Sequence, residues 1–551
     1  MESLCVKLLK SIFILPFCAG NLRRRRNGLW NYDCTISSRV LFLIIVAVVI
    51  VFTASREIQT HVEVRLGFVL LLLTVIMLST ICGMCHLGWL VQKDGLLSIV
   101  SAKRDTRTPK LQVVFLWVFG IGSGLYCALF VGKQIECSVL TNGGFYWHAL
   151  FYFNILLTIS IFTDLIFLSY FSPFELKQTT SVNFAMFITL TANVTVILYI
   201  YLLDGTLLFV KIIDPDVQLI SCIDNNSTMT ILLDKSRRFL APTFVEFALL
   251  STTLLLDIWS LTQVYHPDSG STSIEINDRD NSEQTTFIQS ADNQDSEQIC
   301  LLSSVTCTND DPNQAYRQHA AIEPYHSENG DRRKVSQIVT LVGSLTAGLG
   351  LVVCYTAQAM AMENIKNIRY ATEIYELTLA VVMVLVIFVG FFCLTYYCTP
   401  DRSAKHLRPS DYVYLLSAFG VIMLHFYEAL GGDVSSDSAG SIILYRSIIS
   451  LFQDYLQVVF LLQANRCKKS RSSVDLLESV LIFTMIINII FWFNNSFLLA
   501  EFPSTSILEN DHFSKELLGL VYKVLIPVAI FFRFTSFLEF YATFEKYRSQ
   551  E

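Results

Sequence analysis

Charged residues are scarce in this chain of 551 residues, in which Asp, Glu, Lys and Arg make up 16% and hydrophobic residues 53%. A soluble chain of this length needs more charge to cover its surface. The mean hydropathy of +0.50 and the 41 phenylalanines indicate instead that many apolar side chains face lipid. The composition therefore predicts an integral membrane protein.

The sequence also lacks the motifs of the common enzyme classes. It contains no Walker motif, no serine-nucleophile elbow and no metalloprotease helix, and no metal cluster or nucleophile–base set converges in it. No extended basic face is present for nucleic acid. We therefore expect neither enzymatic activity nor a cofactor, a metal ion or a nucleic-acid partner.

Two short motifs suggest chemistry, but their context favours helix packing. Cys82–His86 matches the pattern for covalent haem attachment, yet it lies within a predicted span, and a rigid helix does not offer an open loop. Gly120–Gly124 also falls within a predicted span and does not follow a strand, so close approach of two membrane helices explains it better than nucleotide binding. The other cysteines mostly lie in apolar segments, which is typical of small buried hydrophobic residues and not of a disulfide framework.

About twelve segments are apolar enough to cross a bilayer, which requires roughly 20 residues each. They lie near residues 39–55, 64–90, 111–136, 146–170, 181–203, 241–264, 336–360, 370–398, 410–430, 441–465, 474–498 and 516–546. The predicted fold is therefore an all-α polytopic membrane protein in two six-helix halves. We assign a cytoplasmic N-terminal segment to 1–38, membrane halves to 39–264 and 336–546, a linker to 265–335 and a cytoplasmic tail to 547–551.

Basic residues concentrate in alternate loops, which predicts the orientation. Arg23–Arg26 precede the first span, Arg332–Lys334 precede the seventh, and further basic residues lie between spans two and three, eight and nine, and ten and eleven. The loop 204–240, on the opposite side, is an exception. We predict a multi-pass protein of the cell membrane with both termini in the cytoplasm. The overlapping glycosylation sequons at Asn225 and Asn226 agree, because they fall in a loop assigned to the outside.

The linker 265–335 is rich in Ser, Asp, Glu, Asn and Gln and contains few aromatic residues. Such a segment cannot bury enough apolar surface to offset the entropy of ordering. We predict that it is disordered, and a regulatory role for it stays open.

Ionisable and amide side chains within the spans are the most informative feature. A charged side chain at the centre of a bilayer costs about 2.5–3.5 kcal/mol on insertion scales, so each needs a partner or a hydrated cavity. Structural ion pairs would explain any single one, but polar rows in both halves favour a proton or ion route. The proton-path candidates are Glu136, Asp164, Glu246, His425, Glu428, Gln453 and Gln457. Structural or gating roles are predicted for Lys133, Lys523, Arg533 and Glu539.

Five short segments of these spans form a recognisable set: Phe119–Tyr126 with Gly132 and Glu136, Pro242–Phe247, Ser417–Gly420, Gln453–Ala464 and Ile526–Phe534. They resemble segments of the otopetrins, a family of proton channels with twelve spans. Each segment is short, but their order, their placement on the spans and the plan of six spans, a linker and six spans make the resemblance specific.

The resemblance implies that each half forms a barrel-like bundle and that two subunits pair into a homodimer. It also implies inward proton conduction activated by external acid, with routes through each half and along the interface between the halves that have polar constrictions rather than an open pore. By position, Glu136, Glu246, Gln457 and Arg533 fall where the family keeps polar residues.

Three positions depart from the family pattern. Lys133 and Asp164 stand where Gln is more usual, and Lys523 stands where His is more usual. A lysine, unlike a histidine, stays charged near neutral pH, so Lys523 in a proton path would be an electrostatic barrier. These departures indicate a diverged member, in which conduction by the second half is in doubt.

We interpret the pattern as a passive route in which water chains alternate with protonatable side chains. Glu246 would relay protons in the outer third of the sixth span, and Asp164 would face it from the fourth. Gln457 would hold water at a constriction in the second half, and Arg533 would pair with a nearby acid such as Glu539 or Glu428.

Two other functional classes stay open. A secondary transporter often has twelve spans in two halves, although the short, interrupted span pairs typical of a mid-membrane substrate site are not evident. A receptor or scaffold would act through the acidic linker. Solute uptake coupled to a gradient would identify a transporter, and a requirement of residues 265–335 for signalling without current would identify a receptor or scaffold.

Overall fold

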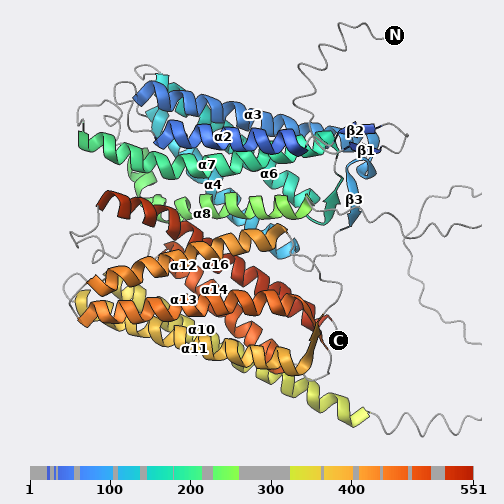
Figure 1. Ribbon diagram of the computed structural model, residues 1–551, viewed down its shortest axis with the longest axis vertical. Helices are drawn as coiled ribbons and strands as arrows, with labels where there is room; N and C mark the ends of the chain where they lie inside the picture. Colours follow the sequence, from blue (N-terminus) through green and yellow to red (C-terminus); the bar gives the residue numbers. More distant parts are fainter. Residues whose placement is uncertain are drawn as a thin grey trace, which may run out of the picture. The chain divides into compact units, whose positions relative to one another are not determined.

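The computed structural model describes residues 22–24, 30–32, 35–54, 62–103, 109–136, 145–177, 179–213, 228–259, 323–360, 365–400, 409–434, 438–469, 475–497 and 515–549. Within these ranges lie twelve α-helices, one short 3-10 helix and six short strands (Figure 1). The predicted sequons at Asn225 and Asn226, and the linker as far as residue 322, fall outside the described residues.

Each of the twelve predicted spans overlaps one helix, although some helix ends differ from the prediction. In the first half they are α2 (Thr35–Ala54), α3 (Val62–Asp94), α4 (Pro109–Glu136), α6 (Phe145–Phe171), α7 (Thr180–Ile213) and α8 (Thr228–Ile258). In the second half they are α10 (Glu323–Met360), α11 (Ile365–Tyr397), α12 (Pro409–Val434), α13 (Ser438–Asn465), α14 (Asp475–Phe497) and α16 (Lys515–Arg548). Helix α10 begins at Glu323, so the prediction that all of the linker 265–335 is disordered is wrong for its last part, which is helical.

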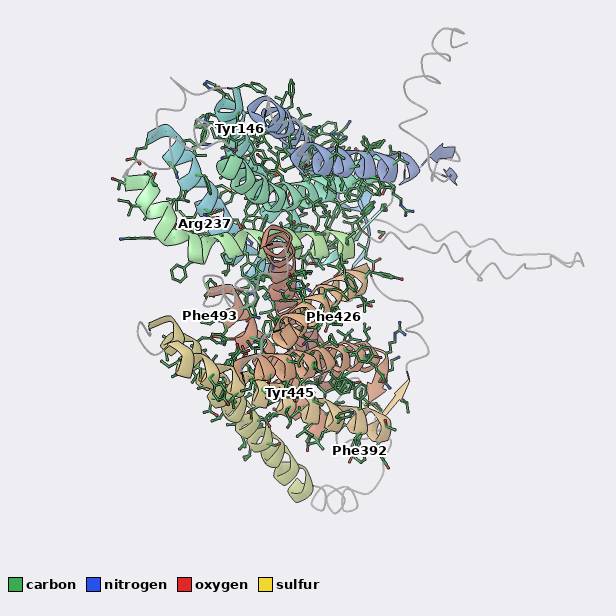
Figure 2. All side chains as sticks on the ribbon, turned by 60° about the vertical axis from the view of Figure 1, so that its left-hand side comes forward. Tyr146, Arg237, Phe392, Phe426, Tyr445 and Phe493 are labelled. Atoms are coloured by element: carbon green, nitrogen blue, oxygen red, sulfur yellow. The ribbon has the colours of Figure 1, made fainter. Side chains whose placement is uncertain are left out.

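Eleven of the described helices contain a stretch long and apolar enough to cross a membrane, and α2 contains the shorter apolar stretch Arg39–Val51. Helices suit this setting because hydrocarbon offers no partner to backbone N–H and C=O groups, which a helix satisfies internally. Large apolar side chains such as Phe392, Phe426 and Tyr445 are exposed on the outside of the second half, as expected for lipid-facing surfaces (Figure 2). The predicted all-α polytopic membrane fold is confirmed.

The chain divides into two compact units, residues 1–261 with 335–551 and residues 262–334. Within the first unit, the helices of the two halves make corresponding contacts. Helices α3, α6, α4, α8 and α7 form a closed ring of neighbours, and α2 packs outside it against α3 and α7. Helices α11, α13, α12, α16 and α14 form the matching ring, and α10 packs outside it against α11 and α14. Each half is therefore a ring of five helices with a sixth helix at its side.

Short antiparallel ribbons repeat the correspondence. Strand β3 (Val100–Lys103) pairs with β4 (Phe174–Leu176) in the first half, and β5 (Cys398–Pro400) pairs with β6 (Cys467–Lys469) in the second. In both halves the ribbon joins the connection after the second helix to the connection after the fourth. A third ribbon, β1 (Leu22–Arg24) with β2 (Trp30–Tyr32), precedes α2, and the 3-10 helix η4 (Leu96–Ser98) follows α3.

Glycines set the close approach of α4 to its neighbours. A Cβ atom on Gly122 would lie 2.6 Å from Thr243 Oγ1 of α8, and one on Gly120 would lie 2.6 Å from Leu165 Cδ1 of α6. These contacts leave no room for a side chain. The interpretation of Gly120–Gly124 as a helix-packing motif is confirmed.

Aromatic rings fill the interface between the two halves. Phe534 of α16 lies with its ring centroid 5.0 Å from Phe115 and 5.1 Å from Phe119 of α4, and 5.5 Å from Trp492 of α14. Edge-to-face and tilted pairs of this kind contribute about 0.5–1.5 kcal/mol each beyond their burial. The interface is therefore packed by apolar rings around these residues.

Candidate functional site

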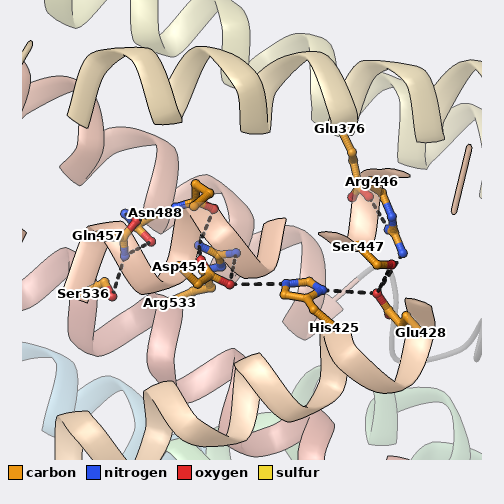
Figure 3. Close-up of polar contacts among 11 residues, drawn as sticks. Glu376, His425, Glu428, Arg446, Ser447, Asp454, Gln457, Asn488, Arg533 and Ser536 are labelled. Atoms are coloured by element: carbon orange, nitrogen blue, oxygen red, sulfur yellow. Dashed lines mark hydrogen bonds and ion pairs between the residues drawn. The ribbon is translucent and has the colours of Figure 1, made fainter. Parts of the chain in front are cut away.

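Four ionisable residues of the second half form one continuous chain of contacts with Arg446 of α13 (Figure 3). His425 of α12 lies between two carboxylates, with Nδ1 3.2 Å from Glu428 Oε2 and Nε2 3.3 Å from Asp454 Oδ2. Arg533 of α16 holds Asp454 from the other side, with Nη1–Oδ1 at 2.7 Å and Nη2–Oδ2 at 3.1 Å. Arg446 Nη2 lies 2.9 Å from Glu428 Oε2. This ionic network ties α12, α13 and α16 together.

The network extends to α11 through Arg446. Its Nε lies 3.0 Å from Glu373 Oε2, and its Nη1 lies 2.5 Å from Glu376 Oε2. The hydroxyl of Tyr355 on α10 donates to Glu376. Arg446 thus binds carboxylates from α11 and α12 at once, which favours a structural role for this end of the network.

Amides continue the polar chain beyond Arg533. Gln453 Nε2 donates to Gln457 Oε1 at 2.9 Å, and Gln457 Nε2 donates to Ser536 Oγ at 2.9 Å and to Asn488 Oδ1 at 3.2 Å. Asn488 Nδ2 returns a bond to Gln457 Oε1 at 3.1 Å. Tyr414 and Ser536 share a hydroxyl–hydroxyl bond of 3.2 Å. Each polar atom of the Gln457 side chain is therefore bonded to a protein group.

This arrangement agrees in part with the sequence predictions. The structure brings the candidates His425, Glu428, Gln453 and Gln457 together with Arg533. It pairs Arg533 with Asp454, whereas Glu539 accepts a bond of 3.5 Å from Asn465 Nδ2. Sequence reasoning did not list Asp454, Arg446, Asn488 and Ser536 as site residues, although each is a polar residue within an apolar span and the same criterion finds them.

The first half contrasts with the second, because its buried acids Asp164 and Glu246 make no ion pair within the part of the chain that the structure describes. Asp164 of α6 is 2% exposed, and its Oδ1 has no hydrogen-bond partner among the described residues. Glu246 of α8 is also 2% exposed, and its Oε1 accepts a bond of 3.0 Å from Trp492 Nε1 across the interface between the halves. Its Oε2 has no partner in the described part of the chain. Among the described residues, no hydrogen bond or ion pair joins Asp164 to Glu246, whose carboxylate binds Trp492 of α14 instead.

Two buried amides of the first half also have polar atoms without hydrogen-bond partners among the described residues. Both polar side-chain atoms of Gln134 on α4, and the Nδ2 atom of Asn154 on α6, lack partners within the described ranges. Leaving a buried donor or acceptor unsatisfied costs about 1–3 kcal/mol, so such groups are expected to bind water. The second half also contains such groups, since both polar side-chain atoms of the fully buried Asn494 lack partners among the described residues. The two halves differ in their acids: Asp454 and Glu428 lie in ion pairs, whereas the described residues give Asp164 and Glu246 none.

The remaining candidates lie at helix ends. Glu136 is exposed at the C-terminal end of α4 and accepts the backbone N–H groups of Thr228 at 3.2 Å and Met229 at 2.8 Å, so it caps α8. Lys133 lies in the last turn of α4. Lys523 lies in the first third of α16, and its side chain falls outside the described residues. None of these positions is at the middle of a span.

Two similar rings of apolar helices, each with buried polar groups, define a polytopic membrane protein with two related halves. A model of the otopetrin family matches residues 211–534, more than half of the chain. The chain therefore belongs to the otopetrin family, a family of channels. Comparison with curated proteins gives no match.

Proposed function

We propose that this otopetrin conducts protons across a membrane down their electrochemical gradient. Membership of a channel family supports transport, and two buried acids support the proton as the transported ion. The single observation that carries the proposal is that Asp164 and Glu246 are each buried with a carboxyl oxygen that has no partner among the described residues.

The chemistry follows from the cost of burying charge. An ionised carboxylate taken out of water costs several kcal/mol unless a counter-charge compensates it. Among the described residues, no ion pair joins a basic side chain to Asp164 or Glu246. Each acid must therefore hold a proton or contact water, and a group that alternates between these conditions passes protons along a water chain.

Orientation and assembly are part of the proposal. The alternation of basic loops supports placing both termini in the cytoplasm of a cell-membrane protein, and family resemblance supports a homodimer. Proteolysis of sealed vesicles and the mass of the detergent-solubilised protein test these two assignments.

Proton flux into liposomes tests the function. Purified protein is reconstituted with a pH-sensitive dye inside the vesicles, a potassium gradient and valinomycin set the potential, and no organic solute is added. We expect dye acidification, and we expect Asp164→Asn or Glu246→Gln to reduce its rate at least tenfold. Glu545→Gln, on a surface ion pair with Arg548, is the matched loss of one carboxylate and should leave the rate unchanged.

The same assay separates the alternative classes. A coupled transporter would need a solute, so proton flux without solute contradicts that mechanism. A receptor or scaffold would give no flux above empty vesicles, and the proposal would then be wrong. Deletion of residues 265–322 should leave flux intact, since the acids lie in the membrane helices.

A further inference from the structure

The two halves carry the same side chains at corresponding positions of their rings. Helix α6 contains Ser-Ile-Phe-Thr-Asp at 160–164, and α13 contains Ser-Leu-Phe-Gln-Asp at 450–454. Helix α7 has a threonine four residues before Asn193. Helix α14 also has a threonine four residues before Asn488. Helix α8 contains a proline nine residues before Ser251. Helix α16 also contains a proline nine residues before Ser536. The three helix pairs therefore share one sequence pattern.

Contacts in space support this correspondence. Asn193 Nδ2 donates to Ser251 Oγ at 3.1 Å in the first half, and Gln457 joins the matching Asn488 and Ser536 in the second. The close packing of the second helix against the fifth also repeats. A Cβ on Gly83 would lie 3.3 Å from Ala185, eight residues before Asn193, and a Cβ on Gly390 would lie 3.1 Å from Val480, eight residues before Asn488. Asp164 and Asp454 thus occupy equivalent places.

The surroundings of these two aspartates differ at several positions, and two of these differences concern the groups that bind or adjoin the acid. Arg533, which binds Asp454, lies six residues after Pro527, and the residue six after Pro242 is Ala248. Gln457 lies three residues after Asp454, and the residue three after Asp164 is Phe167. The first half therefore keeps the acid but lacks both the guanidinium and the bridging amide.

We infer that Arg533 closes the second half to protons, and that alanine at the equivalent position 248 leaves the route open through the first half past Asp164. This inference rests on the proposed function. Arg533 is fixed in place by Asp454, by Gln453 Oε1 at 3.5 Å and by the rings of Phe491 and Phe532, whose centroids lie 4.9 and 5.5 Å from its Cζ.

Arg533 acts against proton transfer at Asp454 through this contact. Its guanidinium lies against both oxygens of the carboxylate, with Nη1–Oδ1 at 2.7 Å and Nη2–Oδ2 at 3.1 Å, so neither oxygen is left for a water chain. The other charged groups that face Asp454 are His425 on α12, with Glu428 and Arg446 behind it, and they complete an ionic network around the acid.

Reciprocal substitutions test the inference in the liposome assay. Ala248→Arg places in the first half the charge that the second half carries, and we expect the proton flux to fall at least tenfold. Arg533→Gln should give the second half a route of its own. The double variant Asp164→Asn/Arg533→Gln should then recover at least a third of the wild-type flux, and adding Asp454→Asn should abolish that recovery.

The outcomes distinguish the two proposals. If the wild type gives no flux, the proposed function fails. If the wild type conducts and Asp454→Asn removes the flux while Ala248→Arg and Asp164→Asn do not, the route lies in the second half and this inference is overturned. Failure of the Asp164→Asn/Arg533→Gln variant to recover flux also overturns it, provided that the variant elutes as a single species in size-exclusion chromatography. The test with the Asp164→Asn/Arg533→Gln variant does not depend on whether the Ala248→Arg variant folds.

Discussion

The equivalent aspartates of the two halves should respond in opposite ways to the same substitution. Asp454 is fully buried and makes a bidentate pair with Arg533, which is itself 5% exposed. Asp454→Asn removes the negative charge and leaves the guanidinium buried without its counter-ion. Breaking one partner of a buried pair costs about 3–5 kcal/mol. His425 still has Glu428 beside it, so we expect a loss near the lower end, about 3 kcal/mol.

We do not expect Asp164→Asn to cause a comparable loss in the free energy of unfolding. Because Asp164 has no charged partner among the described residues, replacing its carboxyl by an amide breaks no ion pair, and we expect a change within about 1 kcal/mol. The free energy of unfolding is measured in mixed detergent micelles by titration with SDS, with the fluorescence of tryptophan as the signal. Each variant is compared with wild type at the same micelle composition.

The charge pair itself is isolated by a double-mutant cycle. Arg533→Gln and Asp454→Asn are each expected to destabilise, and the double variant should be more stable than the sum of the single losses predicts, by about 2 kcal/mol or more. Equal destabilisation by Asp164→Asn and Asp454→Asn would refute the reasoning, because it would mean that the aspartate of the first half is also held by a strong partner.

Three further predictions concern the same scaffold. Glu136→Ala should lower the free energy of unfolding by about 1 kcal/mol through loss of the α8 cap, whereas Glu136→Asp should recover part of it; equal losses would contradict a capping role. Trp492→Phe should cost about 1–3 kcal/mol because it removes the donor to Glu246, and Glu246→Leu in that background should reduce the penalty, while no change on Trp492→Phe would show that the bond carries no weight. Gly122→Ala should cost about 1–3 kcal/mol because its Cβ meets Thr243, whereas Gly343→Ala, where nothing lies within 4 Å, should be neutral; similar effects at both sites would contradict the tight α4–α8 contact.

The helical framework could be predicted from the sequence because one physical constraint dominates it. Spans such as 370–398 are continuous apolar runs, and hydrocarbon forces such runs into helices. Helix ends were less predictable. Helix α8 starts at Thr228, well before the predicted span at 241, because Glu136 of a different helix caps its polar first turn. A cap supplied from 92 residues away in the chain leaves no local signal.

The sequence identified candidate site residues by their polarity, but it did not identify the residues with which they pair. Gln453 and Gln457 were predicted to lie in a polar row, and they do, but a water-holding role for Gln457 depended on its amide being free. The structure shows its amide bonded to Asn488 and Ser536. Which polar groups satisfy one another depends on the rotation of each helix about its axis, and a hydropathy profile does not report that rotation.

Polar side chains in hydrocarbon therefore have two stable solutions, and this chain contains both. In the second half, acids, bases and amides are close enough to satisfy one another, so the same residue types that suggest a route form a packed core. In the first half the acid remains and no base pairs with it among the described residues, so Asp164 must hold a proton or contact water. Comparing position 248 with position 533 distinguishes the two solutions, and that comparison needs only the sequence once Pro242 is matched to Pro527 and Asp164 to Asp454. Two similar halves thus serve as controls for each other, because the half with the ion pairs shows which partner the other half lacks among the described residues.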